Sequence, residues 1–598
     1  MERRTHLTVL ALIFALGAYL RLVDLTGPSL WLDEIIHLQV TRSLADEPWY
    51  QHALGVSEVA GVTENGPLYY RLQIWGQKLA PGELGVRLFP AIVGILTLPL
   101  MAVTARRIGG PHLAVVATLL LAVSPLHVYF SREGRPYYLL MTLTLWLLYA
   151  LLQRGSRTGT ALAVSGCLLS AYVGIQCLPV LMSFAVLSTG AALGDLRRRR
   201  SAPSRDRLAA LQAPAAACVA LALAFGLYMT RSDVNSPLRE KAPAQAKVEK
   251  SPLYQSPVSQ RSLSLLLASM TTSGHPTRSL EPRSWLLLAL AIAGLLAGLR
   301  RRSLGTVLTV GMFLLPTVLS LAALVSVSRW YGIRYTSAGL LPFLLLTAMG
   351  LVALAERIGQ RLAKRASRRQ VAAWVTSLAV ALLLVAPNLE AARQDPFRKL
   401  DWRGVAQFFD AIALDDEPVL IPNGWPQLCL DHYLQELDRS VEFVTIWESA
   451  ELGEQAVTER QRGWLLTAGF RRTNEVRAWM HRFVSVLKKP EEELDLFFFP
   501  DFKTLFETRF AAGKGAVFTQ RFAEMGQRFE FVEDERLLKG QGWSYPERND
   551  TASFQWAVGS QAELGLPVDL PADAPPSDAT LRLRVLPYLY PEAPPQNL

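Results

Sequence analysis

The chain has 598 residues, which is too long for one compact domain. Apolar residues make up 51% of it, and they are concentrated in residues 1–390 as runs long enough to cross a bilayer. The net charge of +10 comes from short basic clusters between these runs and not from one patch, which argues against nucleic-acid binding. The four cysteines have no paired spacing and predict neither a disulfide framework nor a cysteine metal site.

The apolar runs predict an α-helical integral membrane protein with about eleven transmembrane helices. The first run has a basic start and no small-residue cleavage site, so we expect a retained anchor. The runs cover residues 7–25, 86–105, 112–130, 137–152, 159–173, 177–193, 209–229, 283–299, 304–327, 336–355 and 371–389.

The basic clusters fall in alternate connections between the runs. Because lysine and arginine are enriched on the cytoplasmic side of membranes, this pattern predicts a cytoplasmic N-terminus. The odd number of runs then puts everything after about residue 390 outside the cytoplasm. The clusters are Arg3–Arg4, Arg106–Arg107, Arg154 with Arg157, Arg197–Arg200, Arg300–Arg302 and Arg357–Arg369.

The first external connection, about residues 26–85, carries the candidate catalytic residues Asp33 and Glu34. Trp31 precedes this pair, and His37 lies one helical turn after Asp33. The local sequence leaves two interpretations open. The pair can be the acidic first turn of a solvated helix, or it can supply a catalytic base, with Glu34 setting the local field or assisting a metal ion.

The same connection contains two stretches, 33–45 and 67–79, with apolar residues at helical spacing. We expect two helices there that lie flat on the membrane surface. Glu64 stands near the start of the second stretch and is a reserve candidate for the base. Tyr69 within it is a candidate sugar contact or an interfacial aromatic residue. The later loop 231–282 is polar and proline-rich and is expected to form a flap.

Arginines in later external connections are the candidate substrate-binding residues: Arg132 and Arg135 in one, and Arg334 with Tyr335 in another. A carboxylate that accepts the proton of an attacking hydroxyl, with arginines that bind a departing phosphate, is the set that sugar transfer from a lipid phosphate needs. The arginines can also be lipid headgroup anchors.

Four motifs in order resemble the GT-C superfamily: Trp31-Leu32-Asp33-Glu34, Asn65-Gly66-Pro67-Leu68-Tyr69-Tyr70, Ser131-Arg132-Glu133-Gly134-Arg135-Pro136-Tyr137 and Arg334-Tyr335. More narrowly, they resemble polyprenyl-phosphate-sugar-dependent enzymes of the protein-mannosyltransferase and aminoarabinose-transferase type, including lipopolysaccharide-core galacturonosyltransferases. The resemblance covers about residues 5–390. It implies that Asp33 is the catalytic acidic residue of the first loop and that Arg334 lies near the donor phosphate. The family often has two prolines where this chain has Gly66-Pro67.

The C-terminal part alternates helical and strand patterns over residues 391–540, which predicts an external α/β domain without a phosphate loop or a nucleophile elbow. Residues 541–598 change to short strands and resemble the opening of a carbohydrate-associated β-sandwich. Two or three strands cannot bury a core, so either the given chain stops short or these strands join the preceding domain. The expected domains are thus 1–390, 391–540 and 541–598.

These observations predict an inverting membrane glycosyltransferase. It would move a sugar from a polyprenyl-phosphate donor onto an extracytoplasmic lipid, glycan or protein acceptor at the bacterial inner membrane. A divalent cation, Mg²⁺ or Mn²⁺, beside Asp33 is left open. Two alternatives remain. One is a lipid-linked glycan transporter, which would require charged residues inside several spans. The other is an enzyme with its site on the same side of the membrane that transfers or polymerises oligosaccharides.

Overall fold

The chain forms two compact units in the computed structural model. The helical unit comprises Met1–Ala406 and Trp425–Glu436, and the sheet unit comprises Gln407–Gly424 and Leu437–Leu598. The residues that the structure describes are 3–48, 51, 65–198, 204–231, 282–326, 333–362, 366–393, 399–422, 424–446, 449–468, 479–480, 483–489, 494–499, 538–539, 547–548, 553–554 and 564–565.

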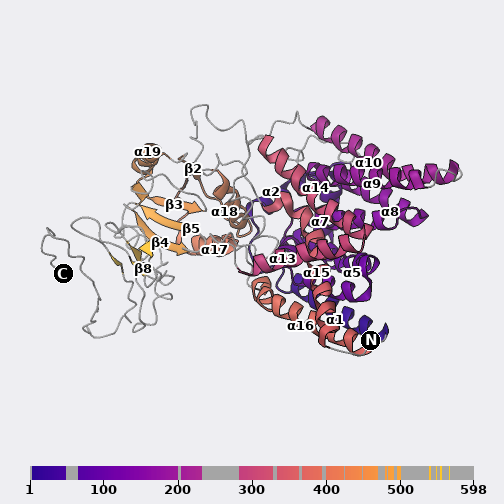
Figure 1. The fold of residues 1–598 in the computed structure, drawn as a ribbon. Helices are drawn as coiled ribbons and strands as arrows, with labels where there is room; N and C mark the ends of the chain where they lie inside the picture. Colours follow the sequence, from indigo (N-terminus) through magenta and orange to yellow (C-terminus); the bar gives the residue numbers. More distant parts are fainter. Residues whose placement is uncertain are drawn as a thin grey trace, which may run out of the picture. The chain divides into compact units, whose positions relative to one another are not determined.

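Each apolar run lies in a helix over most of its length, which confirms the predicted helical membrane fold (Figure 1). Among the described residues, five helices are long and apolar enough to cross a membrane, and four shorter apolar helices accompany them. The helices that contain the apolar runs are α1 (Arg3–Leu22), α5 (Glu83–Ala122), α6 (Pro125–Phe130), α7 (Tyr137–Leu152), α8 (Arg157–Val173), α9 (Leu178–Arg198), α10 (Ser204–Arg231), α13 (Pro282–Arg300), α14 (Leu304–Ser326), α15 (Leu340–Leu362) and α16 (Ala366–Arg393).

Helix α5 contains the run expected at 86–105 and most of the run expected at 112–130, separated by a sharp kink. The backbone leaves the helical conformation at Gly109 and Gly110, and Gly110 has a φ of 83°. Glycine tolerates this left-handed conformation because it has no Cβ. Pro111 then suits the first turn of the second segment, since its missing N–H would have no helical partner there.

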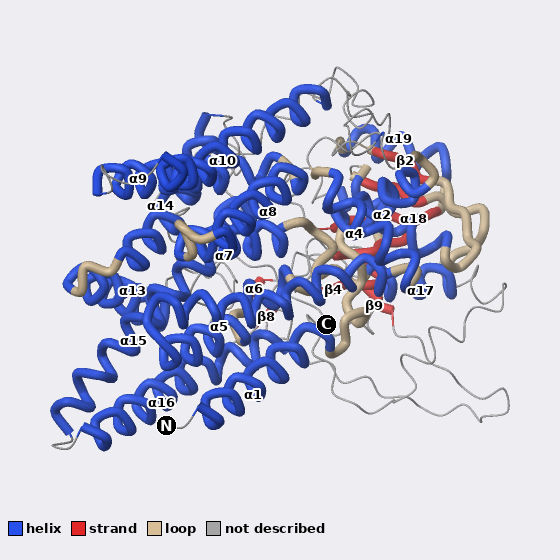
Figure 2. Tube along the Cα trace, turned by 90° about the vertical axis from the view of Figure 1, so that its right-hand side faces the viewer, coloured by secondary structure: helices blue, strands red, loops and turns tan. Residues whose placement is uncertain are grey.

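A buried arginine joins α1 to α5 and α6. Arg21 donates from Nη1 to the Ala122 carbonyl at 3.0 Å, and its Nη2 lies 2.7 Å from Nδ1 of His127. These bonds meet the requirement that a charge inside an apolar helix bundle has polar partners. At the other end of α1, His6 contacts Trp374 of α16 edge-on with ring centroids 4.6 Å apart, and Figure 2 shows these two helices side by side.

Two helices form in the first connection, α2 (Leu32–Ala45) and α4 (Pro67–Leu79), as the spacing of apolar residues predicts. The start of α4 pairs with the chain after α8. The N–H of Gly66 donates to the Val173 carbonyl at 2.6 Å, and Asn65 and Gly174 form an antiparallel bridge. A Cβ on Gly66 would lie 2.1 Å from the Tyr172 carbonyl oxygen. Close backbone contact therefore explains why this position is a glycine. The proline that the family often has here would lack the N–H that donates to Val173.

The sheet unit contains a seven-stranded mixed sheet in the order β2-β1-β3-β5-β4-β6-β9. Strands β2, β1 and β3 are parallel, while β3, β5, β4, β6 and β9 pair antiparallel. Buried aromatic residues form its core, with Trp464 and Phe498 in edge contact at 5.1 Å. The strands are β1 (Val419–Ile421), β2 (Phe443–Thr445), β3 (Gly463–Ala468), β4 (Val484–Lys489), β5 (Leu494–Phe499), β6 (Leu538–Lys539) and β9 (Leu564–Gly565).

Three helices of the C-terminal part, α17 (Trp402–Ile412), α18 (Trp425–Gln435) and α19 (Ala450–Arg460), alternate with these strands. The mixed α/β character predicted for this part is confirmed. Of the described strands after residue 540, β9 joins the main sheet by pairing with β6, whereas β7 (Glu547–Arg548) and β8 (Ser553–Phe554) pair in a separate two-stranded sheet. The domain limits at 390 and 540 stay predictions, and the expected flap lies outside the described residues.

Candidate active site

The first turn of α2 directs two adjacent carboxylates into different surroundings. Consecutive residues of an α-helix lie about 100° apart around the axis, so Asp33 and Glu34 cannot face the same way. The side chain of Asp33 keeps 31% of its accessible surface, whereas that of Glu34 keeps none. The two residues therefore have different chemical roles available to them.

Asp33 lies between two arginines that come from distant parts of the chain. Its Oδ2 forms ion pairs with Nη2 of Arg135 and with Nη1 of Arg334, the latter at 3.4 Å. Arg135 precedes α7, and Arg334 belongs to the 3-10 helix η3 (Ile333–Gly339) before α15. The Arg334 side chain is 27% exposed and that of Arg135 is 9% exposed, so an anionic ligand can reach this group from solvent. The structure thus brings together three predicted site residues.

Glu34 is held on all sides by buried partners. Arg87 donates to it from Nε at 3.1 Å and from Nη2 at 3.2 Å, and the Lys399 ammonium lies 2.7 Å from its Oε2. The backbone N–H groups of Trp31 and Gly134 also donate to it, at 3.0 and 2.9 Å. Burial alone would raise the pKa of Glu34, but the two cations and these hydrogen bonds lower it well below its usual range.

This ion cluster joins four parts of the helical unit. Arg87 additionally binds the carbonyls of Leu25, Pro28 and Ser29 at 2.9, 2.7 and 3.0 Å. Glu34 therefore fixes the first connection to α5, to the loop at Gly134 and to the segment at Lys399. A carboxylate with such partners keeps its negative charge and is ill suited to accept a proton near neutral pH.

The loop between α6 and α7 contains Arg132, which was also predicted to bind substrate, and Gly134, which contacts Tyr69. Tyr69 is buried and its hydroxyl donates to the Gly134 carbonyl at 2.6 Å, while desolvation raises its pKa well above the ordinary value. Arg132 donates from Nη2 to the Asp24 carbonyl at 2.8 Å, just beyond the end of α1. Tyr69 and Arg132 thus hold the loop that presents Arg135.

His37 lies on the side of α2 that faces α4. Its Nδ1 is 3.3 Å from the Tyr70 hydroxyl, and its Nε2 is 3.3 Å from Nδ2 of Asn65. Gln176 in turn donates to Oδ1 of Asn65 at 3.3 Å. Desolvation lowers the pKa of His37 to about 4, so this histidine is neutral at physiological pH and acts as a structural partner of α4.

A second set of contacts, within the helical unit, holds the start of the first connection. Arg403 forms an ion pair with Glu83 and donates to the Thr26 carbonyl at 3.0 Å. The Tyr433 hydroxyl donates to Glu83 at 2.6 Å and accepts from the N–H of Leu30 at 2.6 Å. These contacts fix residues 26–30 directly before α2.

Sequence reasoning missed Arg87 and Lys399. A charge inside the apolar run 86–105 was the available signal for Arg87, because such charges need a polar partner. Of the other predicted site residues, Glu64 lies outside the described residues, and Tyr335 belongs to η3 but its side chain is not described. Among described residues, no three His, Cys, Asp or Glu side chains form a group that could hold a metal ion.

The described apolar helices are those of a polytopic membrane protein, and comparison with known families supports a transferase. Residues 66–232 match the sequence model of the family described as dolichyl-phosphate-mannose-protein mannosyltransferase. This match confirms the resemblance to GT-C glycosyltransferases. No curated protein matches the chain.

Solved structures of two proteins are similar to this chain. ArnT from Cupriavidus metallidurans in the apo state has 12% identity over 83% of this chain and 97% of that chain, with a TM-score of 0.47. The same protein bound to undecaprenyl phosphate has 14% identity over 83% and 97%, with a TM-score of 0.45. The archaeal oligosaccharyltransferase AglB from Archaeoglobus fulgidus, with an inhibitory peptide and a dolichol-phosphate, has 12% identity over 82% and 74%, with a TM-score of 0.47.

Proposed function

We propose that this protein is an inverting glycosyltransferase that moves a sugar from a polyprenyl-phosphate donor to an acceptor outside the cytoplasm. The observation that carries the proposal is the partly exposed carboxylate of Asp33 between the guanidinium groups of Arg135 and Arg334. A proton acceptor beside two planar anion-binding groups matches a reaction in which a hydroxyl attacks and a phosphate departs.

In the proposed reaction, the acceptor hydroxyl oxygen attacks the anomeric carbon of the sugar, and the bond between that carbon and the phosphate oxygen breaks. The bonding electrons stay on the phosphate, which leaves as the polyprenyl phosphate. Asp33 accepts the proton of the attacking hydroxyl. Arg135 and Arg334 bind the phosphate through bidentate hydrogen bonds and stabilise the charge that it gains.

The neighbouring residues act through position in this proposal. Glu34 keeps α2 in place through its buried bonds to Arg87 and Lys399, so that Asp33 meets the two arginines. Tyr69 and Arg132 hold the loop of Arg135 by bonds to backbone carbonyls. Direct substrate contacts of these residues, of Tyr335 and of Glu64 stay predictions, and so does a divalent cation beside Asp33.

The test is Asp33→Asn, which keeps the shape of the side chain and removes the proton acceptor. We expect transfer from a polyprenyl-phosphate sugar to fall by about two to four orders of magnitude, the usual effect of losing a positioned base. Asp46→Asn makes the same chemical change at an exposed residue after α2 and should leave the rate unchanged. A folded Asp33→Asn protein with a near wild-type rate would contradict the proposal.

The orientation proposed for this reaction has a cytoplasmic N-terminus, with Asp33 on the far side of the membrane. It rests on the arginine clusters in alternate connections. Reporter fusions after Ser201 and after Asp401 should report opposite sides of the inner membrane. A result that puts both positions on one side would overturn this orientation without affecting the assignment of the base.

A further inference from the structure

Arg135 has two carboxylate partners, and the structure separates them by their exposure. Besides Asp33 at Nη2, its guanidinium pairs with Glu133, whose Oε1 lies 3.6 Å from Nη1. The side chain of Asp33 keeps 31% of its accessible surface, whereas that of Glu133 keeps none. A phosphate ligand can therefore displace Asp33 from Arg135, but it cannot reach Glu133.

Tyr129 of α6 in turn binds Glu133. The Tyr129 hydroxyl donates to Oε1 of Glu133 at 3.0 Å. The Lys399 ammonium lies over the Tyr129 ring, 5.7 Å from its centroid, within the range of a cation–π contact. Lys399 also binds Glu34. Tyr129 and Glu133 thus connect the ion cluster around Glu34 to the arginine that pairs with Asp33.

The backbone fixes the short turn that carries Glu133 and Arg135. The N–H of Arg135 donates to the Glu133 carbonyl at 2.8 Å, with Gly134 between them. The N–H of Gly134 donates to a carboxylate of α2 at 2.9 Å, and its carbonyl accepts a hydrogen bond from a hydroxyl of α4 at 2.6 Å. A Cβ on Gly134 would lie 2.1 Å from Cγ1 of Val86, so a larger residue would displace the turn. The turn therefore sets both backbone positions before a ligand binds.

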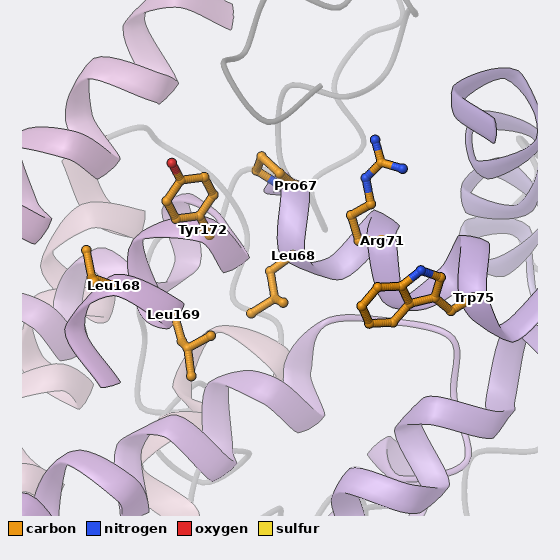
Figure 3. A pocket seen from close by; sticks show the side chains of 7 residues that line it. All are labelled: Pro67, Leu68, Arg71, Trp75, Leu168, Leu169 and Tyr172. Carbon is orange, nitrogen blue, oxygen red and sulfur yellow. The ribbon is translucent and has the colours of Figure 1, made fainter. Parts of the chain in front are cut away.

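Helix α4 contacts this turn with one face only. Tyr69 lies on that buried face and donates to Gly134. Leu68, Arg71 and Trp75 line an apolar groove of about 530 Å³ against α8, as Figure 3 shows. Arg71 is thus a cation of the same helix on the groove side, and it provides a control for the arginines that pair with Asp33.

We propose that Glu133 is a positioning residue that keeps the Arg135 guanidinium in place when a phosphate ligand displaces Asp33. The proposal rests on the proposed function, in which Arg135 binds the phosphate of the donor. An arginine that loses one carboxylate partner gains rotational freedom, and ordering such a side chain weakens ligand binding. Because Glu133 keeps its contact, Arg135 stays ordered while Asp33 becomes available for the proton of the acceptor.

The negative charge of Glu133 does not prevent an anion from binding here. It lowers the positive potential at Arg135, but the connected ion cluster contains more cations than carboxylates. Four cations and three carboxylates leave one positive charge among these described residues, and protonation of Asp33 would add another. The members are Arg87, Arg135, Arg334 and Lys399 with Asp33, Glu34 and Glu133.

The experiment measures binding of undecaprenyl phosphate to the full-length protein in detergent, with a double-mutant cycle over Glu133 and Arg135. Glu133→Gln keeps an acceptor for the Tyr129 hydroxyl and removes the charge. It should raise the Kd about two- to tenfold, the effect of ordering one long side chain on binding. In an Arg135→Gln background the same change should have no further effect, because Glu133 acts through Arg135.

The controls separate this effect from a general loss of structure. Tyr129→Phe removes only the hydroxyl that binds Glu133, and it should raise the Kd less than Glu133→Gln does. This milder variant gives the same test if Glu133→Gln does not fold. Arg71→Gln on the groove side of α4 and Glu451→Gln at an exposed residue should leave the Kd unchanged.

Three results would overturn the inference. Unchanged or tighter binding by Glu133→Gln would show that its charge only competes with the phosphate. An equal loss in the Arg135→Gln background would show that Glu133 acts on the fold and not through Arg135. A wild-type protein that does not bind the probe would overturn the inference and the proposed function together. Asp33→Asn separates the two, because it should lose transfer and still bind the probe, and normal transfer by this variant would contradict the proposed function alone.

Discussion

Replacement of Glu34 by glutamine is expected to lower stability far more than replacement of an exposed acid. The neutral amide would keep the volume of the side chain but leave Arg87 and Lys399, whose side chains are 1% and 5% exposed, without their anion. Removing one partner of a buried ion pair costs about 3–5 kcal/mol. The carbonyls that also bind Arg87 compensate part of this loss, so we expect the lower end, about 3 kcal/mol.

The buried cysteines provide the assay. Cys167, Cys177 and Cys429 are buried in the folded protein and become reactive when it unfolds, so a thiol-reactive dye follows thermal unfolding in detergent. We expect Glu34→Gln to lower the midpoint by several degrees. Asp46→Asn serves as the matched control. The reasoning is refuted if both variants unfold at the same temperature as the wild type.

The pH dependence of this difference follows from the lowered pKa of Glu34. An unfolded glutamate has a pKa of about 4.3, whereas the pKa in the folded protein lies well below its usual range because of Arg87 and Lys399. The stability contributed by the charge is therefore fully present above about pH 5 and is lost as the pH falls toward the folded value. The difference in midpoint between wild type and Glu34→Gln should stay constant above about pH 5 and shrink from about pH 5 to pH 3.5. A difference that does not shrink in this range would contradict the ionic origin.

Three further variants test the site and its support. Arg334→Ala should raise the donor KM far more than Arg334→Lys, which keeps the charge but not the planar fork; equal small effects would mean a membrane anchor only. Gly66→Ala should lower the unfolding midpoint because its Cβ meets the Tyr172 carbonyl, at a cost of about 1–3 kcal/mol, while Gly190→Ala in open space should not. Arg132→Gln should lower stability and raise the donor KM less than Arg334→Ala does, because Arg132 holds the loop of Arg135 through the Asp24 carbonyl; an equal rise in KM would indicate phosphate contact.

The long helices and the two helices of the first connection were predictable because they depend on local patterns. Apolar runs of bilayer length define the long helices, and the spacing in 33–45 and 67–79 defines α2 and α4. The kink at Gly109–Gly110 also follows from local sequence, through adjacent glycines before a proline. The order of the strands was not predictable, because the pairing of β4 with β5 joins strands by contacts that the local sequence does not specify.

The partners of the site residues were not predictable, since they join segments far apart in the chain. Lys399 follows the last long helix and pairs with a carboxylate just after the first. Arg21 and Arg87 lie within two of the apolar runs, 7–25 and 86–105, where their partners cannot be read from the neighbouring sequence. Both arginines bind backbone carbonyls near helix ends, so they connect helices of the bundle and do not line a transport path.

The two adjacent carboxylates show how the partners of a carboxylate decide whether it can accept a proton or can only hold its helix in place. Asp33 and Glu34 share the same helix turn and the same distance from the first long helix, so local sequence cannot assign their roles. The difference comes from one helical step of about 100°, which turns Glu34 toward two buried cations and leaves Asp33 partly exposed beside two arginines. A carboxylate that accepts a proton needs partners that a substrate can displace. A carboxylate with a structural role needs buried partners that no substrate displaces. By this criterion Asp33 is the residue to test for chemistry, and Glu34 the residue to test for stability.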